Sequence, residues 1–151
     1  MPSRRADVRM TDDEVGALLA YARKVQIATI NPDGTPHLVT MFFGLAGGRI
    51  AFWTYRASRK ALNLARDPRI TCLVEDGEDY FELRGVQITG TVQRIDDLAG
   101  VTEVGRLIAG RMPDVPREAL DAYVTHAARK RVAYVVEPVR VASWDHRRLV
   151  A

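Results

Sequence analysis

Two hydroxyl residues and two cations follow closely on one another near the middle of the chain, at Thr54, Ser58, Arg59 and Lys60. Ser58 is a favourable helix N-cap, and a helix N-terminus presents unpaired N–H groups at the positive end of its dipole. Hydroxyl, ammonium and guanidinium groups beside such a terminus are suitable donors for a phosphate dianion. The types and spacing therefore predict a phosphate-binding site within residues 52–69.

A solvated surface helix is the alternative interpretation of residues 52–69, which hold five cations and one acid, Asp67. For a run of charges taken alone, this alternative is the better one. The run, however, directly follows aromatic and β-branched residues that favour a strand. A strand-to-helix junction would bring several phosphate donors to one place, and this favours the binding site.

The same stretch resembles the phosphate-binding segment of the pyridoxamine 5′-phosphate oxidase-like split-barrel superfamily, whose flavin/deazaflavin oxidoreductases use FMN or coenzyme F420. In that superfamily a strand ending in Thr precedes Ser-Arg-Lys, then Asn-Leu, then Asp-Pro-Arg and another strand. The residues that fit this pattern are Thr54, Ser58, Arg59, Lys60, Asn63, Leu64, Asp67, Pro68 and Arg69. The resemblance extends from about residue 25 to about residue 94. It implies a six-stranded antiparallel split barrel that forms a homodimer, with two cofactor sites in the interface.

A second candidate region is the expected strand over residues 36–43, which lies where the superfamily places a strand beneath the flavin or deazaflavin ring. Such a ring needs a flat, largely apolar wall and backbone groups for its pyrimidine edge. The residues that could provide them are Val39, Thr40, Met41 and Phe42. Core packing is the alternative, and both can hold on opposite faces of one strand.

Two departures from the oxidases bear on the cofactor. Pyridoxamine 5′-phosphate oxidases carry an Arg and a Lys along this strand, at the positions of Val39 and Gly44. The F420-using relatives also lack them, so the resemblance favours an F420-dependent oxidoreductase. An FMN-binding oxidase, reductase or flavin carrier is the second hypothesis.

Trp144 with Arg148-Leu149 resembles the oxidases' C-terminal Trp…Arg-Leu, whose Trp contacts the neighbouring subunit's flavin, although the spacing is shorter and Val150 replaces a His. A Trp that caps the barrel edge is the equal alternative.

Short strands separated by turns must position these residues. We expect one mainly β domain over residues 1–151, a closed or partly closed antiparallel barrel with peripheral helices. Residues 1–10 are expected to be a flexible tail and residues 44–48 a turn. Helices are expected at 12–23, after Ser58, at 96–111 and at 117–128, and strands at 25–30, 36–43, 49–54, 70–74, 80–83, 86–94 and 132–141, the last interrupted by Pro138.

Other functional classes receive little support. No Gly-rich P-loop or dinucleotide motif and no nucleophile elbow occurs, and the three His are far apart in sequence, so no metal site and no catalytic side chain are predicted. The single Cys72 excludes an internal disulfide. A barrel that binds single-stranded nucleic acid is a weak third hypothesis, because the net charge is only +3. We expect a cytoplasmic protein, since no long apolar run or signal peptide is present.

Overall fold

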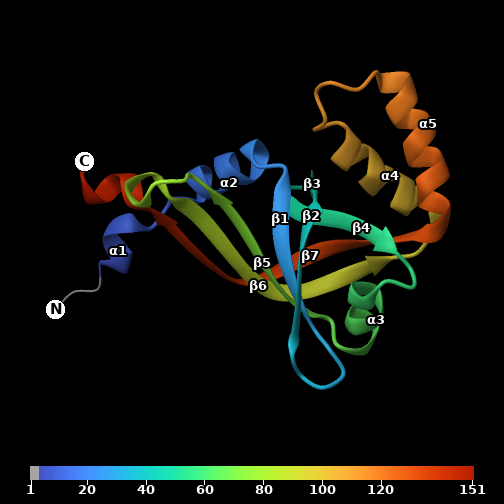
Figure 1. Ribbon diagram of the computed structural model, residues 1–151, viewed down its shortest axis with the longest axis horizontal. Helices are drawn as coiled ribbons and strands as arrows, with labels where there is room; N and C mark the ends of the chain where they lie inside the picture. Colours follow the sequence, from blue (N-terminus) through green and yellow to red (C-terminus); the bar gives the residue numbers. More distant parts are fainter. Residues whose placement is uncertain (1–3) are drawn as a thin grey trace.

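One antiparallel sheet curves around the core as a half-barrel (Figure 1). The computed structural model describes residues 4–151 of the chain. Seven strands follow in the order β2-β1-β5-β6-β7-β4-β3, so β2 and β3 are its edges. The bounds are β1 Lys24–Ile30, β2 Pro36–Phe42, β3 Gly44–Ala46, β4 Arg49–Tyr55, β5 Arg69–Asp76, β6 Arg84–Ile95 and β7 Arg131–Asp145.

The concave face of the sheet holds the main core. Apolar residues alternate along each strand, so one side chain in two points inward. In β1, Val25 and Ile27 are fully buried, and across the sheet the Phe52 ring stacks on Tyr134 with centroids 5.3 Å apart. The buried cluster draws on every long strand except the edge strand β2, which adds only partly buried side chains. This core fixes the register of the strands.

Helices cover the ends of the sheet and part of its convex face (Figure 1). The helix α2, Asp12–Tyr21, begins with a capping box between Thr11 and Glu14, as its sequence predicts. The pair α4, Leu98–Ala109, and α5, Arg117–Ala127, packs over β3, β4 and the first half of β7. The convex face of β2, β1 and β5 has no helix over it among residues 4–151. The smaller helices are α1 Arg5–Val8, α3 Arg59–Arg66 and the 3-10 turns Tyr80–Glu82, Ala128–Lys130 and His146–Leu149.

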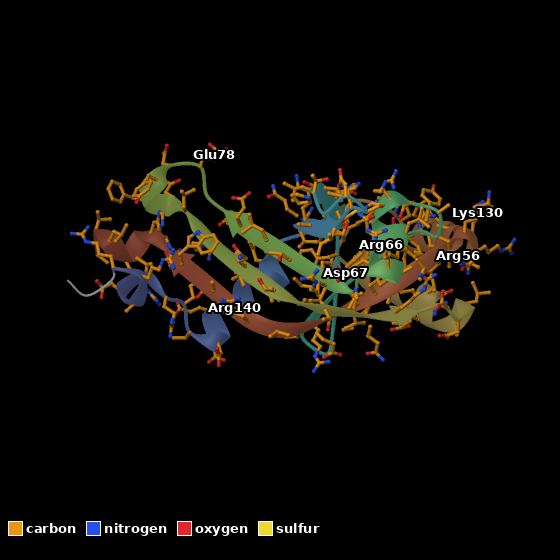
Figure 2. The ribbon with its side chains drawn as sticks, turned by 90° about the horizontal axis from the view of Figure 1, so that it is seen from below. Arg56, Arg66, Asp67, Glu78, Lys130 and Arg140 are labelled. Carbon is orange, nitrogen blue, oxygen red and sulfur yellow. The ribbon has the colours of Figure 1, made fainter. Side chains whose placement is uncertain are left out.

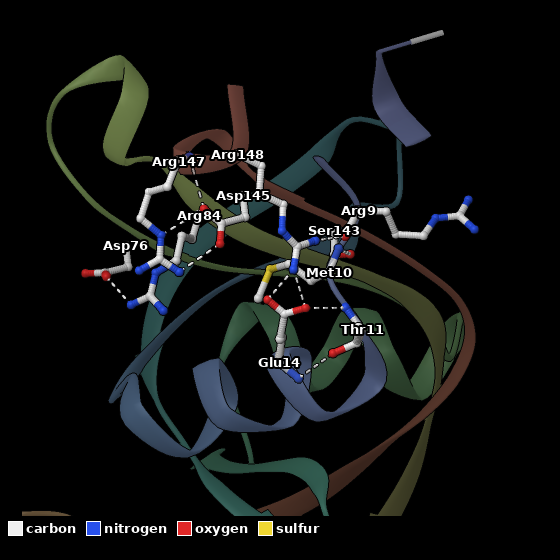
Figure 3. A network of polar contacts seen from close by, with 10 residues as sticks. All are labelled: Arg9, Met10, Thr11, Glu14, Asp76, Arg84, Ser143, Asp145, Arg147 and Arg148. Atoms are coloured by element: carbon white, nitrogen blue, oxygen red, sulfur yellow. Dashed lines mark hydrogen bonds and ion pairs between the residues drawn. The ribbon is translucent and has the colours of Figure 1, made fainter. Parts of the chain in front are cut away.

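The first half of β6 and the second half of β7 extend beyond the barrel as an arm, residues 84–90 and 137–145 (Figure 1). A bulge at Thr89/Gly90 faces Pro138 and bends the pair. The Glu14–Arg148 ion pair ties the end of the arm to the N-terminal segment, and Asp76–Arg84 ties β6 to β5, while Asp145–Arg147 is a local pair at the end of β7 (Figure 3). The arm is therefore held against α1 and α2.

The expected fold is correct in outline and wrong in four details. The sheet has seven strands, because the expected turn contains β3, which pairs with β4 around Gly47 and Gly48, both at positive φ. Residues 80–82 form a 3-10 turn, since the Tyr80 ring packs on His146 instead of joining the sheet. β7 runs through Pro138, which lies at the bulge where ladder hydrogen bonds are already interrupted.

The fourth difference concerns the expected flexible tail. From Arg5 to Val8 the chain is helical, and the Val8 and Met10 side chains are buried. The Met10 N–H donates to the Ser143 hydroxyl at 3.0 Å, which joins this segment to the arm. Residues 1–3 lie outside the described residues. None of the helices from residue 4 onward is long and apolar enough to span a membrane.

Candidate functional site

The junction between β4 and α3 brings two hydroxyl groups together. Thr54 is the last buried residue of β4, and Ser58 is the N-cap of α3, with its oxygen accepting from the Ala61 N–H at 3.2 Å. The Thr54 hydroxyl donates to the same Ser58 oxygen at 3.1 Å. Both lone pairs of the Ser58 hydroxyl are then in use, and its O–H proton remains available to an acceptor outside the chain.

The cations of the junction have no acidic partners. Lys60 is half-buried, and this burial lowers the pKa of its ammonium group. No carboxylate among residues 4–151 forms an ion pair with Lys60 or with Arg59. Two positive side chains at the positive end of a helix repel one another unless an anion is present. We call Thr54, Ser58, Arg59 and Lys60 the junction site, and its donors fit a phosphate.

A second basic segment, residues 129–131, borders the junction site. The sequence did not indicate that these two segments lie side by side. The Arg56 N–H donates to the Lys130 carbonyl at 3.2 Å, and its guanidinium donates to the Arg129 carbonyl at 3.0 Å. Figure 2 shows Arg56 and Lys130 at one end of the molecule. The Arg131 guanidinium lies 4.2 Å from the centroid of the Tyr55 ring. Two segments more than 70 residues apart in sequence therefore share this surface.

Asn63, expected to bind cofactor, lies inside the fold. Its side chain is fully buried, and its amide N–H groups donate to Thr29 Oγ1 at 3.1 Å and to Asn31 Oδ1 at 3.0 Å. Its amide oxygen accepts from the Arg66 guanidinium at 3.2 Å. The residue joins α3 to the β1–β2 hairpin, so it supports the junction site without facing a ligand.

The four ring-wall candidates fall on two faces of the edge strand β2. Val39 and Met41 are half-buried and pack against the core, whereas Thr40 and Phe42 are exposed on the convex face. One edge of β2 has no strand partner in the described chain, so its backbone groups are free to meet a ring edge. Just beyond β2, at the start of β3, a Cβ on Gly44 would lie 2.8 Å from Leu107 Cβ, so α4 leaves no room for a side chain.

Trp144 is far from the other candidates within one chain. It lies in β7 and packs directly on Gly85, where a Cβ would come within 2.2 Å of the indole. The strands β1, β5 and β6 separate it from β2, which is a path along the sheet of about 19 Å at the usual strand spacing. The structure thus joins Thr54 to Ser58 by a hydrogen bond, places Arg59 and Lys60 in the first turn of α3, and leaves Trp144 apart.

The described residues offer little other chemistry. They contain no group of three metal-ligating side chains. Burial raises the pKa of the Cys72 thiol to about 12, so this residue stays a neutral thiol in the core near neutral pH. A reaction at the junction site would need a bound cofactor for its chemistry.

Comparisons with known proteins give relatives of the whole chain. The chain is 27% identical over 151 residues to a pyridoxine/pyridoxamine 5′-phosphate oxidase of Cupriavidus pinatubonensis, an alignment covering 94% of this chain and 69% of that one. A Cupriavidus taiwanensis protein of the same name is 31% identical over 91 residues, which cover 59% of this chain and 41% of the relative.

Two solved structures and one family profile complete the comparison. A conserved hypothetical protein of Mycobacterium tuberculosis is 35% identical, covering 99% of this chain and 93% of the other, with a TM-score of 0.91. An F420 reductase shares the fold at 23% identity and a TM-score of 0.61, covering 83% of this chain and 94% of the other. The family profile described as pyridoxamine 5′-phosphate oxidase matches residues 11–145, and this chain therefore belongs to the pyridoxamine 5′-phosphate oxidase family.

Proposed function

We propose that this protein is an oxidoreductase that binds coenzyme F420, with FMN as the alternative cofactor, and transfers a hydride to or from a small organic substrate. The observation that carries the proposal is the junction site. The half-buried Lys60 has no acidic partner among the described residues, and it lies beside a Ser58 hydroxyl whose proton is unassigned. These are the donors that a cofactor phosphate needs.

The residues of the chain would hold and orient the cofactor. Ser58 and Lys60 donate to the phosphate, Arg59 adds a second positive charge, and Thr54 orients the Ser58 hydroxyl. The β2 strand offers backbone groups at its free edge, and Thr40 and Phe42 offer its exposed face. The bound cofactor would supply the hydride chemistry.

Two positions in and just beyond β2 favour F420 over FMN as the cofactor. The oxidases carry a Lys at the position of Gly44, and here α4 fills the space that such a side chain would take. At the position of the oxidases' phosphate-binding Arg stands Val39, which packs against the core. The phosphate would then depend on the junction site alone, as in the F420-using relatives that the sequence resembles.

We also propose a homodimer. The convex face of β2, β1 and β5 carries the exposed apolar side chains Leu38 and Phe42, 66% and 52% exposed, and no helix covers it in the described chain. A two-fold dimer built on this face would bring Trp144 of one subunit toward the β2 strand of the other. Each cofactor site would then use residues of both chains.

Matched cofactors test the junction site. FMN and riboflavin differ only in the phosphate, as do F420 and its phosphate-free core. We expect the chain to bind the phosphorylated form more tightly, and Lys60→Ala to weaken that form about ten- to a hundredfold, because a charge-assisted contact contributes about 1.5–3 kcal/mol. The affinity for the phosphate-free form should change little. Titrations followed by flavin or deazaflavin fluorescence give all four affinities.

Arg117→Ala is the control, since it removes the same charge from the exposed start of α5, which carries no residue of the junction site or of β2. It should leave both affinities unchanged. Equal binding of the phosphorylated and phosphate-free forms by the unmodified chain would refute the junction site. Tighter binding of FMN than of F420 would make FMN the cofactor and F420 the alternative.

A further inference from the structure

A hollow beside the arm contains no residue of the junction site. It measures about 690 Å³ and lies between α1 and the second half of β7. β4 pairs with β7 only as far as Val135, so residues 136–145 of β7 have a strand partner on one side only. The hollow opens at this free edge. We call it the arm hollow, and its chemistry is set by Arg5, Arg9, Thr89, Arg140, Trp144 and His146.

The arm hollow is basic. Three arginines line it, and none of the described residues that line it is acidic. The guanidinium groups of Arg9 and Arg140 have no hydrogen-bond or ion-pair partner within residues 4–151. Figure 3 shows the Arg9 side chain extended away from the neighbouring polar network, and Figure 2 shows Arg140 on the arm. Uncompensated arginines around a concave surface attract an organic anion.

Two ring systems supply the other wall. The Trp144 indole packs directly on Gly85 and leaves no room for a side chain there. This contact fixes the position of the indole in the hollow. His146 Nδ1 lies 2.8 Å from the Tyr80 carbonyl oxygen, and because a carbonyl only accepts, Nδ1 carries a proton. An indole and an imidazole beside arginines suit a planar ring that bears a negative charge.

The walls of the arm hollow are held in place before any ligand binds. The Arg148 guanidinium donates to the Arg9 carbonyl and to both Glu14 carboxylate oxygens, and the Met10 N–H donates to the Ser143 hydroxyl at 3.0 Å (Figure 3). These contacts fix the backbone of Arg9 beside β7 while its side chain stays outside the network. A site that is ordered in advance loses less entropy when it binds.

We propose that the arm hollow binds a small aromatic carboxylate, with the carboxylate on Arg9 and Arg140 and the ring against Trp144. Binding of this anion needs no cofactor and is independent of the junction site. Its assignment as the substrate rests on the proposed function, in which Trp144 lies at the partner's cofactor ring.

Trp144 can report binding directly. The chain has two tryptophans, so Trp53→Phe leaves Trp144 as the single indole. The probe is para-nitrobenzoate, whose nitro group quenches indole fluorescence, and its neutral match is para-nitrobenzamide. We expect the carboxylate to bind about tenfold more tightly than the amide. Arg9→Gln and Arg140→Gln should each weaken it about three- to tenfold, a modest loss because these arginines are exposed to solvent.

Controls separate this site from the junction site. Arg117→Gln removes the same charge from α5, outside the hollow, and should leave the affinity for para-nitrobenzoate unchanged. Lys60→Ala should also leave it unchanged, even if cofactor binding fails. Equal affinity for carboxylate and amide, no loss in the Arg9→Gln/Arg140→Gln double variant, or a loss caused by Lys60→Ala alone would each overturn the proposal. Equilibrium dialysis with the unmodified tryptophans gives the same comparison if Trp53→Phe does not fold.

Discussion

Asn63 Nδ2 donates a hydrogen bond to the Thr29 hydroxyl at 3.1 Å, and this buried contact joins the helix of the junction site to the strand β1. The same amide nitrogen donates to Asn31, and the Arg66 guanidinium that reaches the Asn63 oxygen also donates to the Ile30 carbonyl. The start of α3 is therefore positioned by the β1–β2 hairpin. Ser58 and Lys60 owe their placement to side chains that no ligand touches.

Asn63→Ala should lower both stability and cofactor affinity. The change leaves a buried Thr29 hydroxyl and the Asn31 amide without their partner, so we expect a loss of about 2–3 kcal/mol in the free energy of unfolding. Affinity for the phosphorylated cofactor should fall, with little change for the phosphate-free form. Urea unfolding and the paired titrations measure the two effects. Leu62→Ala, at an exposed position of the same helix, should cost below about 1 kcal/mol and change neither affinity. Unchanged selectivity for the phosphate in Asn63→Ala would show that the contact serves folding alone.

Met41 and Phe42 lie on opposite faces of β2, so we expect the same substitution to have different effects at the two positions. Met41 packs against the core, so Met41→Asp should destabilise the monomer by about 2–4 kcal/mol through a charge without a partner. Phe42 is 52% exposed on the convex face, so Phe42→Asp should leave the fold intact and weaken dimer formation and cofactor binding. Thermal unfolding and sedimentation velocity distinguish the two results. A Phe42→Asp chain that dimerises and binds cofactor normally would remove this face from the proposed interface.

Local sequence predicted the junction site better than it predicted the sheet. Ser58 caps α3 as expected, because an N-cap depends on residues within one helical turn. The function of Asn63 could not be deduced in the same way, since its partners Thr29 and Asn31 are 34 and 32 residues away. The neighbouring Arg129 and Lys130 are also brought in by tertiary structure alone.

The arm also could not be predicted from local sequence. Arg9 and Arg140 lie 131 positions apart in the sequence, and only the fold of α1 against β7 brings them to one hollow. Residues 1–10 contain three arginines and no run of apolar residues and so resemble a tail, yet Val8 and Met10 are buried. The strand β3 was not predicted because residues 44–48 contain three glycines, a composition typical of a turn, and only pairing with β4 makes residues 44–46 a strand.

The Asp145–Arg147 ion pair should make stability depend on pH in the acidic range. Hydrogen bonds from Arg147 lower the pKa of the buried Asp145 carboxyl. Its contribution is complete above the ordinary Asp pKa of about 3.9 and is lost as the pH falls through the lowered value. Asp145→Asn should therefore cost about 1–2 kcal/mol at pH 7, discounted because Arg147 is exposed, and should flatten the fall in stability below about pH 4.

Urea unfolding between about pH 7 and pH 2.5 measures this effect. The Asp145→Asn variant should keep part of the acid sensitivity, because Thr11 and Arg148 lower the pKa of Glu14 and Arg84 lowers the pKa of Asp76. Asp114→Asn, in the loop before α5, is the control and should follow the parent curve. An Asp145→Asn curve parallel to that of the parent would mean that this pair adds nothing specific in acid.

The proposal that Trp144 acts on the partner's cofactor predicts complementation between two defective chains. Lys60→Ala and Trp144→Ala should each weaken cofactor binding in their own homodimers. In a mixed dimer, a site shared between subunits combines the intact Lys60 of one chain with the intact Trp144 of the other. One of the two sites is then restored and the second carries both defects. Co-expression with two different affinity tags isolates the mixed dimer, and titration should show half of its sites with the parent affinity. If Trp144 acts within its own chain, both sites keep one defect each, no site recovers, and the shared site is refuted.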